Sequence, residues 1–122
     1  MKQLILVGLL LSFASMGAVR EITIQTEKKD DGVHWMPEKI EVTAGEQVKF
    51  MIKHDLEGGF DFHGFFIPQL KVQKEVHRHK AEEITVTIPS DLKPGDYTIG
   101  CHLHPTHKPA TLVVKAAAKK SK

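Results

Sequence analysis

Short runs in which apolar and polar residues alternate recur along most of the chain. Apolar side chains take every second position at Ile22 and Ile24, at Ile40 and Val42, at Val48, Phe50 and Ile52, and at Ile84, Val86 and Ile88. A period of two places such side chains on one face of an extended strand. The pattern therefore predicts several strands with one buried face. Residues 112–114 are more uniformly apolar and predict a closing strand.

Residues typical of tight turns separate these runs. The turn sequences are Asp30-Asp31-Gly32, Ala44-Gly45-Glu46, Gly58-Gly59 and Lys93-Pro94-Gly95-Asp96. Pro89 ends the run at residues 84–88 because proline has no N–H to donate to a sheet. Many short strands joined by such turns predict an all-β fold, either a sandwich or a small barrel. A helix is a candidate only over residues 69–80, although that stretch has no clear period of 3.6.

The first 18 residues have the order of a secretory signal peptide. Lys2 provides a positive charge, residues 4–13 (LILVGLLLSF) are apolar, and mostly small residues follow at positions 14–18 (ASMGA). The apolar run is too short to span a membrane as a helix. We therefore expect a cleavable signal peptide over residues 1–18 and export to the periplasm or beyond, without a membrane span after cleavage. An uncleaved anchor is the alternative.

Length and charge limit the remaining choices. The chain has 122 residues, which is a one-domain length, and its formal net charge is +2. Such a small charge gives no electrostatic basis for binding nucleic acid, so we expect no nucleic-acid partner. We expect one domain over residues 19–115, followed by a basic C-terminal tail at 116–122, where three lysines gather.

One cysteine and eight histidines add candidate chemistry. In an oxidising compartment structural cysteines occur in pairs, so the single Cys101 is a buried spectator, an intermolecular bridge, a reactive thiol or a metal ligand. Three histidines follow it in Cys101-His102-Leu103-His104-Pro105-Thr106-His107. A strand ending at Cys101, followed by a loop that folds back, would bring His104 and His107 to the thiolate. Thiolate and imidazole together suit copper or zinc, and suit calcium or magnesium poorly.

A further ligand would come from a distant part of the chain. His63 stands among aromatic residues in Phe60-Asp61-Phe62-His63-Gly64-Phe65-Phe66, and an apolar surrounding excludes water and orients a ligand. Taken alone, His63 is more simply interpreted as a hydrogen-bonded core histidine. With the Cys-x-x-His loop downstream, we predict that it is a ligand. Side chains alternate along a strand, so His102 should point away from the metal. His54 is expected to be a loop residue.

Three segments resemble the cupredoxin family. The first is Pro37 followed by Ile40-x-Val42-x-Ala44-Gly45-x-x-Val48-x-Phe50. The second, His63-Gly64-Phe65-Phe66-Ile67-Pro68, resembles the first copper-histidine segment of cytochrome oxidase subunit II and nitrous oxide reductase. The third, Lys93-Pro94-Gly95-x-Tyr97-x-x-x-Cys101-x-x-His104-Pro105, resembles the family's ligand loop. The resemblance implies a Greek-key β-sandwich that holds one copper ion, with His63, Cys101 and His104 as the strong ligands.

The sequence departs from the blue-copper pattern at the axial position. No methionine follows His104, and His107 stands where related short loops have methionine. The segment CHLHPTHKPATLVV most resembles nitrosocyanin, a red copper protein in which a glutamate completes the site, and Glu57 lines up roughly with that glutamate. We predict His63, Cys101, His104 and His107 as the ligands, with Glu57 as a replacement or fifth ligand.

Three functions are candidates for an exported mononuclear copper protein of this kind. The first is one-electron transfer, in which His104 lets electrons leave toward a redox partner protein. The second is a periplasmic copper chaperone or storage protein that hands copper to an accepting protein. The third is a small red-copper enzyme, which would need an open coordination position. We expect the electron carrier.

Overall fold

The computed structural model describes residues 19–117. These residues form nine strands and one short 3-10 helix, and no α-helix. The elements are β1 (Arg20–Lys29), β2 (Gly32–Met36), β3 (Lys39–Thr43), β4 (Gln47–Lys53), β5 (Phe62–Ile67), η1 (Pro68–Leu70), β6 (Val72–His77), β7 (Glu82–Thr87), β8 (Gly95–Ile99) and β9 (Ala110–Lys115). The predicted signal peptide at 1–18, and residues 118–122 of the predicted tail, lie outside the described residues. No helix in the described part is long and apolar enough to cross a membrane.

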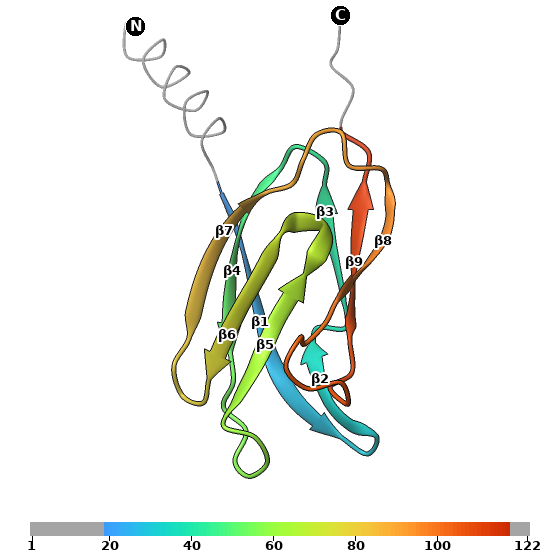
Figure 1. Cartoon of the computed structure of the whole chain (residues 1–122). Helices are drawn as coiled ribbons and strands as arrows, with labels where there is room; N and C mark the ends of the chain where they lie inside the picture. The colour runs from blue at the N-terminus through green and yellow to red at the C-terminus, as the bar shows by residue number, and fades with distance from the viewer. Residues whose placement is uncertain (1–18, 118–122) are drawn as a thin grey trace, which may run out of the picture.

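The strands form the two layers of a sandwich (Figure 1). One layer has the order β2-β1-β4-β7, and the other contains β3-β9-β8 together with the hairpin of β5 and β6. A bridge between Phe66 and Gly100 joins that hairpin to the segment that follows β8. The pairs β1–β4 and β3–β9 are parallel, and the remaining pairs are antiparallel. The predicted all-β sandwich is confirmed.

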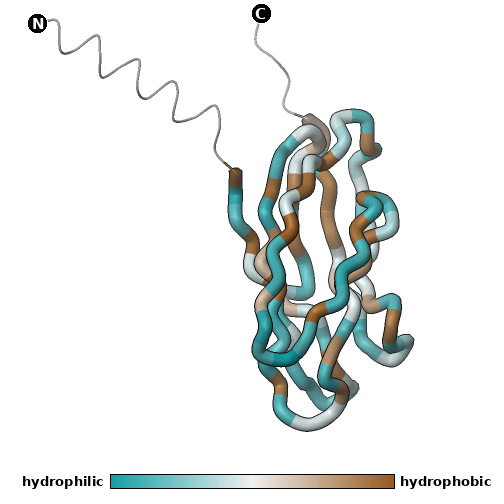
Figure 2. Tube along the Cα trace, turned by 60° about the vertical axis from the view of Figure 1, so that its left-hand side comes forward, coloured by the Kyte–Doolittle hydropathy of each residue, from teal (hydrophilic) through white to brown (hydrophobic). Residues whose placement is uncertain are grey.

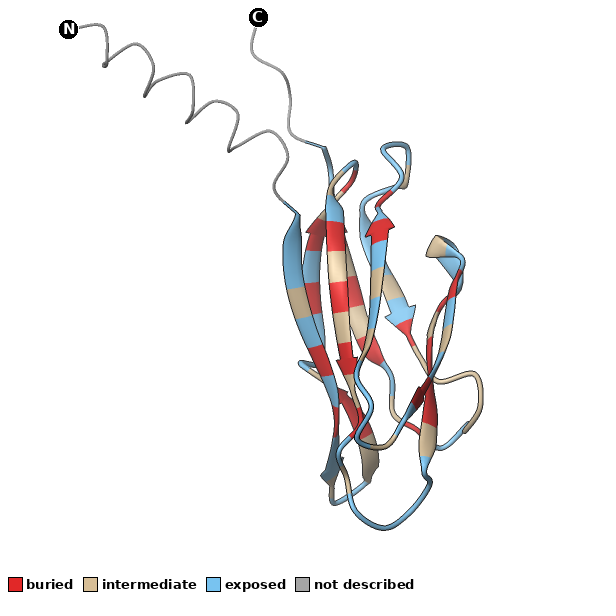
Figure 3. Cartoon of the chain, turned by 90° about the vertical axis from the view of Figure 1, so that its left-hand side faces the viewer, coloured by how far each residue is buried: buried red, intermediate tan, exposed pale blue. Residues whose placement is uncertain are grey.

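The buried faces of the strands meet between the layers. Buried and exposed residues alternate along the strands in Figure 3, and hydropathy alternates along the same strands in Figure 2. In β4 the side chains of Val48, Phe50 and Ile52 are fully buried, as the period of two predicts. The ring of Phe50 lies 5.4 Å from that of Phe65 on β5, so these two strands pack face to face.

The stretch considered for a helix, residues 69–80, is half strand, and it contains no α-helix. It contains the end of η1 and all of β6, which pairs with β5 along its whole length. Val72 and Val76 are the buried residues of β6. A spacing of four fits one face of a strand as well as one face of a helix, which is why the sequence pattern alone was ambiguous here.

Replacing Phe50 should test the core directly. Because Phe50 is fully buried between the layers, Phe50→Ala should lower the free energy of unfolding by about 3–5 kcal/mol. Chemical denaturation followed by the fluorescence of Trp35, the single tryptophan, measures this change. The control is Thr85→Ala on the exposed face of β7, which should change stability by less than about 0.5 kcal/mol. Equal effects of the two substitutions would contradict the burial of Phe50 between the layers.

Candidate metal centre

Three of the predicted ligands come together at one end of the sandwich. Ligand atoms of His63, Cys101 and His104 all lie within 4.8 Å of one another. His63 is the second residue of β5, whereas Cys101 and His104 belong to the loop between β8 and β9. Residues far apart in the sequence therefore supply one cluster, because the sheet places the start of β5 beside this loop (Figure 1).

The fourth predicted ligand adjoins this cluster. The Nδ1 atoms of His107 and His63 are 2.8 Å apart, and their ring centroids are 4.6 Å apart. On the other side, Cys101 Sγ lies 3.9 Å from His104 Nδ1. Donors that bind one metal at about 2.0–2.3 Å are separated by roughly 3–4 Å. His107 therefore lies next to the three-residue cluster, in contact with His63.

Backbone hydrogen bonds hold the ligand loop at both ends. Phe66 and Gly100 exchange two of them, at 3.0 and 2.8 Å, immediately before Cys101. At the other end, the Lys108 N–H donates to the Val33 carbonyl at 2.7 Å. The indole N–H of Trp35 also donates to the Gly100 carbonyl, at 3.1 Å. The loop is fixed by main-chain contacts that do not depend on a metal.

The sulfur of Cys101 has a hydrogen-bond donor of its own. The backbone N–H of Gly64 donates to Sγ at 3.1 Å. A side chain at Gly64 would force the His102 ring to move, because a Cβ there would overlap with Nδ1 of His102. His102 thus lies over Gly64 and near Phe66, at 5.5 Å between ring centroids, and does not belong to the cluster.

Burial keeps two of the imidazoles neutral. His63 and His107 are 3% and 6% exposed. Burial, with a smaller contribution from neighbouring imidazoles, lowers the pKa of His63 to about 4 and that of His107 to about 3. Nε2 of His107 is buried without a hydrogen-bond partner. At neutral pH both rings are uncharged, so each can offer a nitrogen lone pair to a metal.

Aromatic rings surround the cluster. The Trp35 ring lies 4.7 Å from that of His107, and Phe60 is stacked on His104 at 3.8 Å with 15° between the ring planes. Phe62 lies 5.4 Å from His104 on another side. This is the apolar surrounding that the aromatic residues near His63 predicted.

His54 lies deeper than the sequence interpretation expected. It is 1% exposed, and its ring lies 4.6 Å from that of His63. Its Nδ1 contacts the Thr26 hydroxyl at 2.8 Å, and its Nε2 donates to the Phe60 carbonyl at 2.9 Å. The signal was present in the sequence, because position 54 continues the buried alternation of residues 48, 50 and 52.

Glu57 lies apart from the three-residue cluster. Its side chain is 77% exposed, and its carboxylate contacts His79 Nε2 at 2.7 Å. Asp55 occupies the other ring nitrogen of His79, at 3.3 Å. Glu57 does line a cavity that also reaches His63. As placed, it is a partner of His79 on the surface.

The donor set fits a copper ion. One thiolate and two imidazoles within 4.8 Å, with a third imidazole 2.8 Å from His63, match the two-histidine, one-cysteine sites in which copper is held with a further axial group. Such a set lacks the carboxylate and carbonyl oxygens that hard cations need.

Comparison with known families agrees with this chemistry. Residues 3–114 match the family model of the Cupredoxin-like domain. The chain belongs to the cupredoxin family. Family membership and the donor cluster together imply that this cupredoxin binds copper. A comparison with curated protein sequences returned no match.

Solved structures share the fold of this cupredoxin. The Cu(I)-bound metal-binding domain of the exporting ATPase CopA from Streptococcus pneumoniae D39 superposes with a TM-score of 0.64 at 13% identity, covering 81% of this chain and 88% of that one. Auracyanin A, a blue copper protein from Chloroflexus aurantiacus, gives 0.59 at 15%, covering 80% and 100%. The periplasmic domain of cytochrome oxidase subunit II from Bradyrhizobium japonicum gives 0.53 at 13%, covering 83% and 88%. At these identities the similarity shows the fold alone.

Overpacking at Gly64 should destabilise this cupredoxin. Gly64→Ala places a methyl group against the His102 ring, so it should lower the free energy of unfolding by about 1–3 kcal/mol. Removing the obstacle in Gly64→Ala/His102→Ala should restore most of the loss in chemical denaturation. Gly100→Ala is the matched control, since its nearest neighbour is 3.9 Å away. Failure of the double variant to recover would contradict the contact.

The buried imidazoles should make the metal-free protein sensitive to acid. Below about pH 6.5 the unfolded chain protonates these histidines, whereas folded His63 and His107 stay neutral down to about pH 4 and 3. The unfolded state therefore binds more protons, and the free energy of unfolding should fall by about 1.4 kcal/mol per pH unit for each imidazole. Urea denaturation of metal-free protein between pH 7 and 4.5 measures the slope. In His107→Phe the slope should be shallower; an unchanged slope would contradict the assignment.

Proposed function

We propose that this cupredoxin is an exported one-electron carrier that holds one copper ion between His63, Cys101, His104 and His107. The observation that supports it is the convergence of a thiolate and two imidazoles within 4.8 Å, with the third imidazole against His63. Bound copper would supply the one-electron redox chemistry. The role of the protein chain would be to keep these four donors in one arrangement.

A nearly fixed arrangement favours rapid electron transfer. The Phe66–Gly100 pairing and the Lys108–Val33 hydrogen bond hold the ligand loop on both sides. The Gly64 N–H donates to the sulfur and would stabilise negative charge on it, as hydrogen bonds to a thiolate do. Ligands that are held by the sheet need little movement when the charge at the site changes.

The absence of a methionine after His104 should distinguish this site from an ordinary blue one, because His107 would supply the further donor. We infer that His107 takes the position that methionine has in related short loops. Axial ligand identity tunes the reduction potential of such sites, and a nitrogen donor favours Cu(II) over Cu(I). The potential should therefore be lower than that of a methionine-ligated site in the same fold.

His104 is the ligand through which we propose that electrons pass to a partner protein. It is partly exposed, whereas His63 and His107 are buried. Removal of residues 1–18 on export would place residues 19–115 in the periplasm, where a redox partner protein would meet this edge of the domain.

A copper chaperone or storage protein is the second candidate. Two cavities, of about 190 and 250 Å³, are lined by both His63 and Phe60, so an accepting protein would approach the centre from this side. The similar CopA domain is the metal-binding domain of a Cu(I)-exporting ATPase and was solved with Cu(I), which is consistent with such a role. A red-copper enzyme would need Glu57 among the ligands, and the contact of Glu57 with His79 gives this candidate no support.

The visible spectrum of the mature domain with one equivalent of Cu(II) tests the proposal. An intense charge-transfer band from thiolate to copper should appear, and it should be lost in Cys101→Ser because only the thiolate can produce it. The control is His77→Ala, which removes an exposed imidazole from β6 and should leave the band unchanged.

Cyclic voltammetry of the same sample, together with a chelator challenge, distinguishes an electron carrier from a copper chaperone. A carrier should give a reversible one-electron wave and should keep its copper, whereas a chaperone should lose copper readily to a chelator. A pale spectrum that does not depend on Cys101 would overturn both.

A further inference from the structure

Phe60 covers a proposed ligand at the surface of the molecule. Its ring is stacked on His104 with a centroid distance of 3.8 Å. Phe60 is nevertheless 54% exposed, one of two large hydrophobic residues left exposed in the described part of the chain. Burial in the core therefore does not explain its position. Something else holds the ring on His104.

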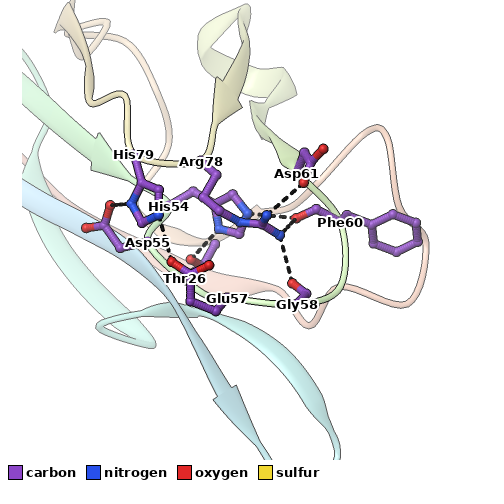
Figure 4. A network of polar contacts seen from close by, with 9 residues as sticks. All are labelled: Thr26, His54, Asp55, Glu57, Gly58, Phe60, Asp61, Arg78 and His79. Carbon is purple, nitrogen blue, oxygen red and sulfur yellow. Dashed lines mark hydrogen bonds and ion pairs between the residues drawn. The ribbon is translucent and has the colours of Figure 1, made fainter.

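Arg78 holds the loop that carries Phe60 (Figure 4). Its Nη2 donates to the carbonyl oxygens of Gly58 and Phe60, at 2.8 and 3.1 Å. Its Nη1 contacts the Asp61 carboxylate at 2.8 Å, and its backbone N–H donates to the Asp61 carbonyl at 2.7 Å. A planar guanidinium with several donors can satisfy these acceptors together, which a lysine ammonium cannot do with the same geometry.

The rest of the loop is attached by polar contacts. His79 meets Asp55 and Glu57, and buried His54 donates to the Phe60 carbonyl. Gly58 and Gly59 both have positive φ, 76° and 68°, and no atom lies within 4 Å of where their Cβ atoms would be. Water can replace polar contacts of this kind, so the loop can open without exposing the core.

Opening of this loop would uncover the centre. The two cavities beside His63 both have Phe60 in their walls. Moving the Phe60 ring away would widen the access to His63 and expose more of His104. His63 lines both cavities and His107 lines one of them, but both side chains are almost fully buried, and Trp35 packs against His107. His104 is therefore the most exposed of the three imidazoles.

We propose that residues 55–61 are a latch over the metal centre: Arg78 positions Phe60 on His104, and copper enters and leaves past Phe60 when the latch opens. The proposal rests on the copper site proposed above. Arg78 acts here as a positioning residue, because it contacts the loop and none of the ligands.

The rate of copper transfer to a chelator tests the latch. Copper-loaded protein is reduced and mixed with excess bicinchoninate, and formation of the Cu(I) complex is followed. Phe60→Ala and Arg78→Lys should each release copper about tenfold faster, a factor typical of losing one hydrogen bond or aromatic contact. Phe60→Tyr keeps a flat ring on His104 and should behave like the unmodified protein.

Two further variants separate positioning from general stability. Arg20→Lys is the matched control, because Arg20 also donates several hydrogen bonds, two to the Glu46 carboxylate and one to the Glu41 carbonyl. This substitution should leave the rate of copper release unchanged. Phe60→Ala/Arg78→Lys should release copper no faster than Phe60→Ala, because Arg78 acts through Phe60. In metal-free Arg78→Lys, amide hydrogens of residues 56–60 should exchange faster than in the Arg20→Lys control.

The outcomes are distinguishable. Unchanged release rates in Phe60→Ala and Arg78→Lys, with the thiolate band intact, would overturn the latch and leave the copper site standing. An equal increase in Arg20→Lys, or additive effects in the double variant, would overturn the role of Arg78. Absence of a thiolate band in the unmodified protein would instead overturn the proposed function.

Discussion

The pair of backbone hydrogen bonds between Phe66 and Gly100 is the contact on which the metal centre depends. It joins β5, which carries His63, to the residue immediately before Cys101. Trp35 donates to the same Gly100 carbonyl and covers His107, so a strand of the opposite layer is tied to the same point. Because main-chain pairing is set by strand register, the donors are brought together before any metal binds.

The two sides of the centre are stabilised by different interactions. His63 and His107 lie in the interior, where packing against Trp35 and loss of solvent keep their rings neutral. His104 lies at the surface beneath Phe60, and the segment that holds Phe60 is attached through carbonyls and carboxylates. Packed cores resist movement, whereas exposed polar contacts exchange readily with water. The buried side therefore sets the geometry, and the exposed side sets access.

Much of this architecture follows from local patterns in the sequence. Alternation at residues 48, 50 and 52 gave the buried face of β4, and the Cys101–His104 spacing indicated the loop that the structure brings to His63. Local pattern could not reveal what depends on contacts across the fold. Nothing near Arg78 indicates that it reaches Gly58 and Phe60, since those contacts exist only once β6 is paired with β5. Glu57 illustrates the same point. Its alignment with a glutamate ligand of a related protein cannot show that the Glu57 carboxylate contacts His79 in this fold.

Electron transfer and copper delivery place opposing demands on the edge at His104. A carrier benefits from an exposed ligand ring and a site that never opens, whereas delivery requires that the ligands become accessible to another molecule. A stacked ring held by one guanidinium would meet both demands at different times. In the closed state Phe60 extends the apolar surface over His104, and in the proposed open state it would uncover His104. The strength of the Arg78 contacts then sets how long the site stays closed. A fold with a rigid sheet and a polar latch can thus be shifted between the two roles by substitutions in residues 55–61, without altering any ligand.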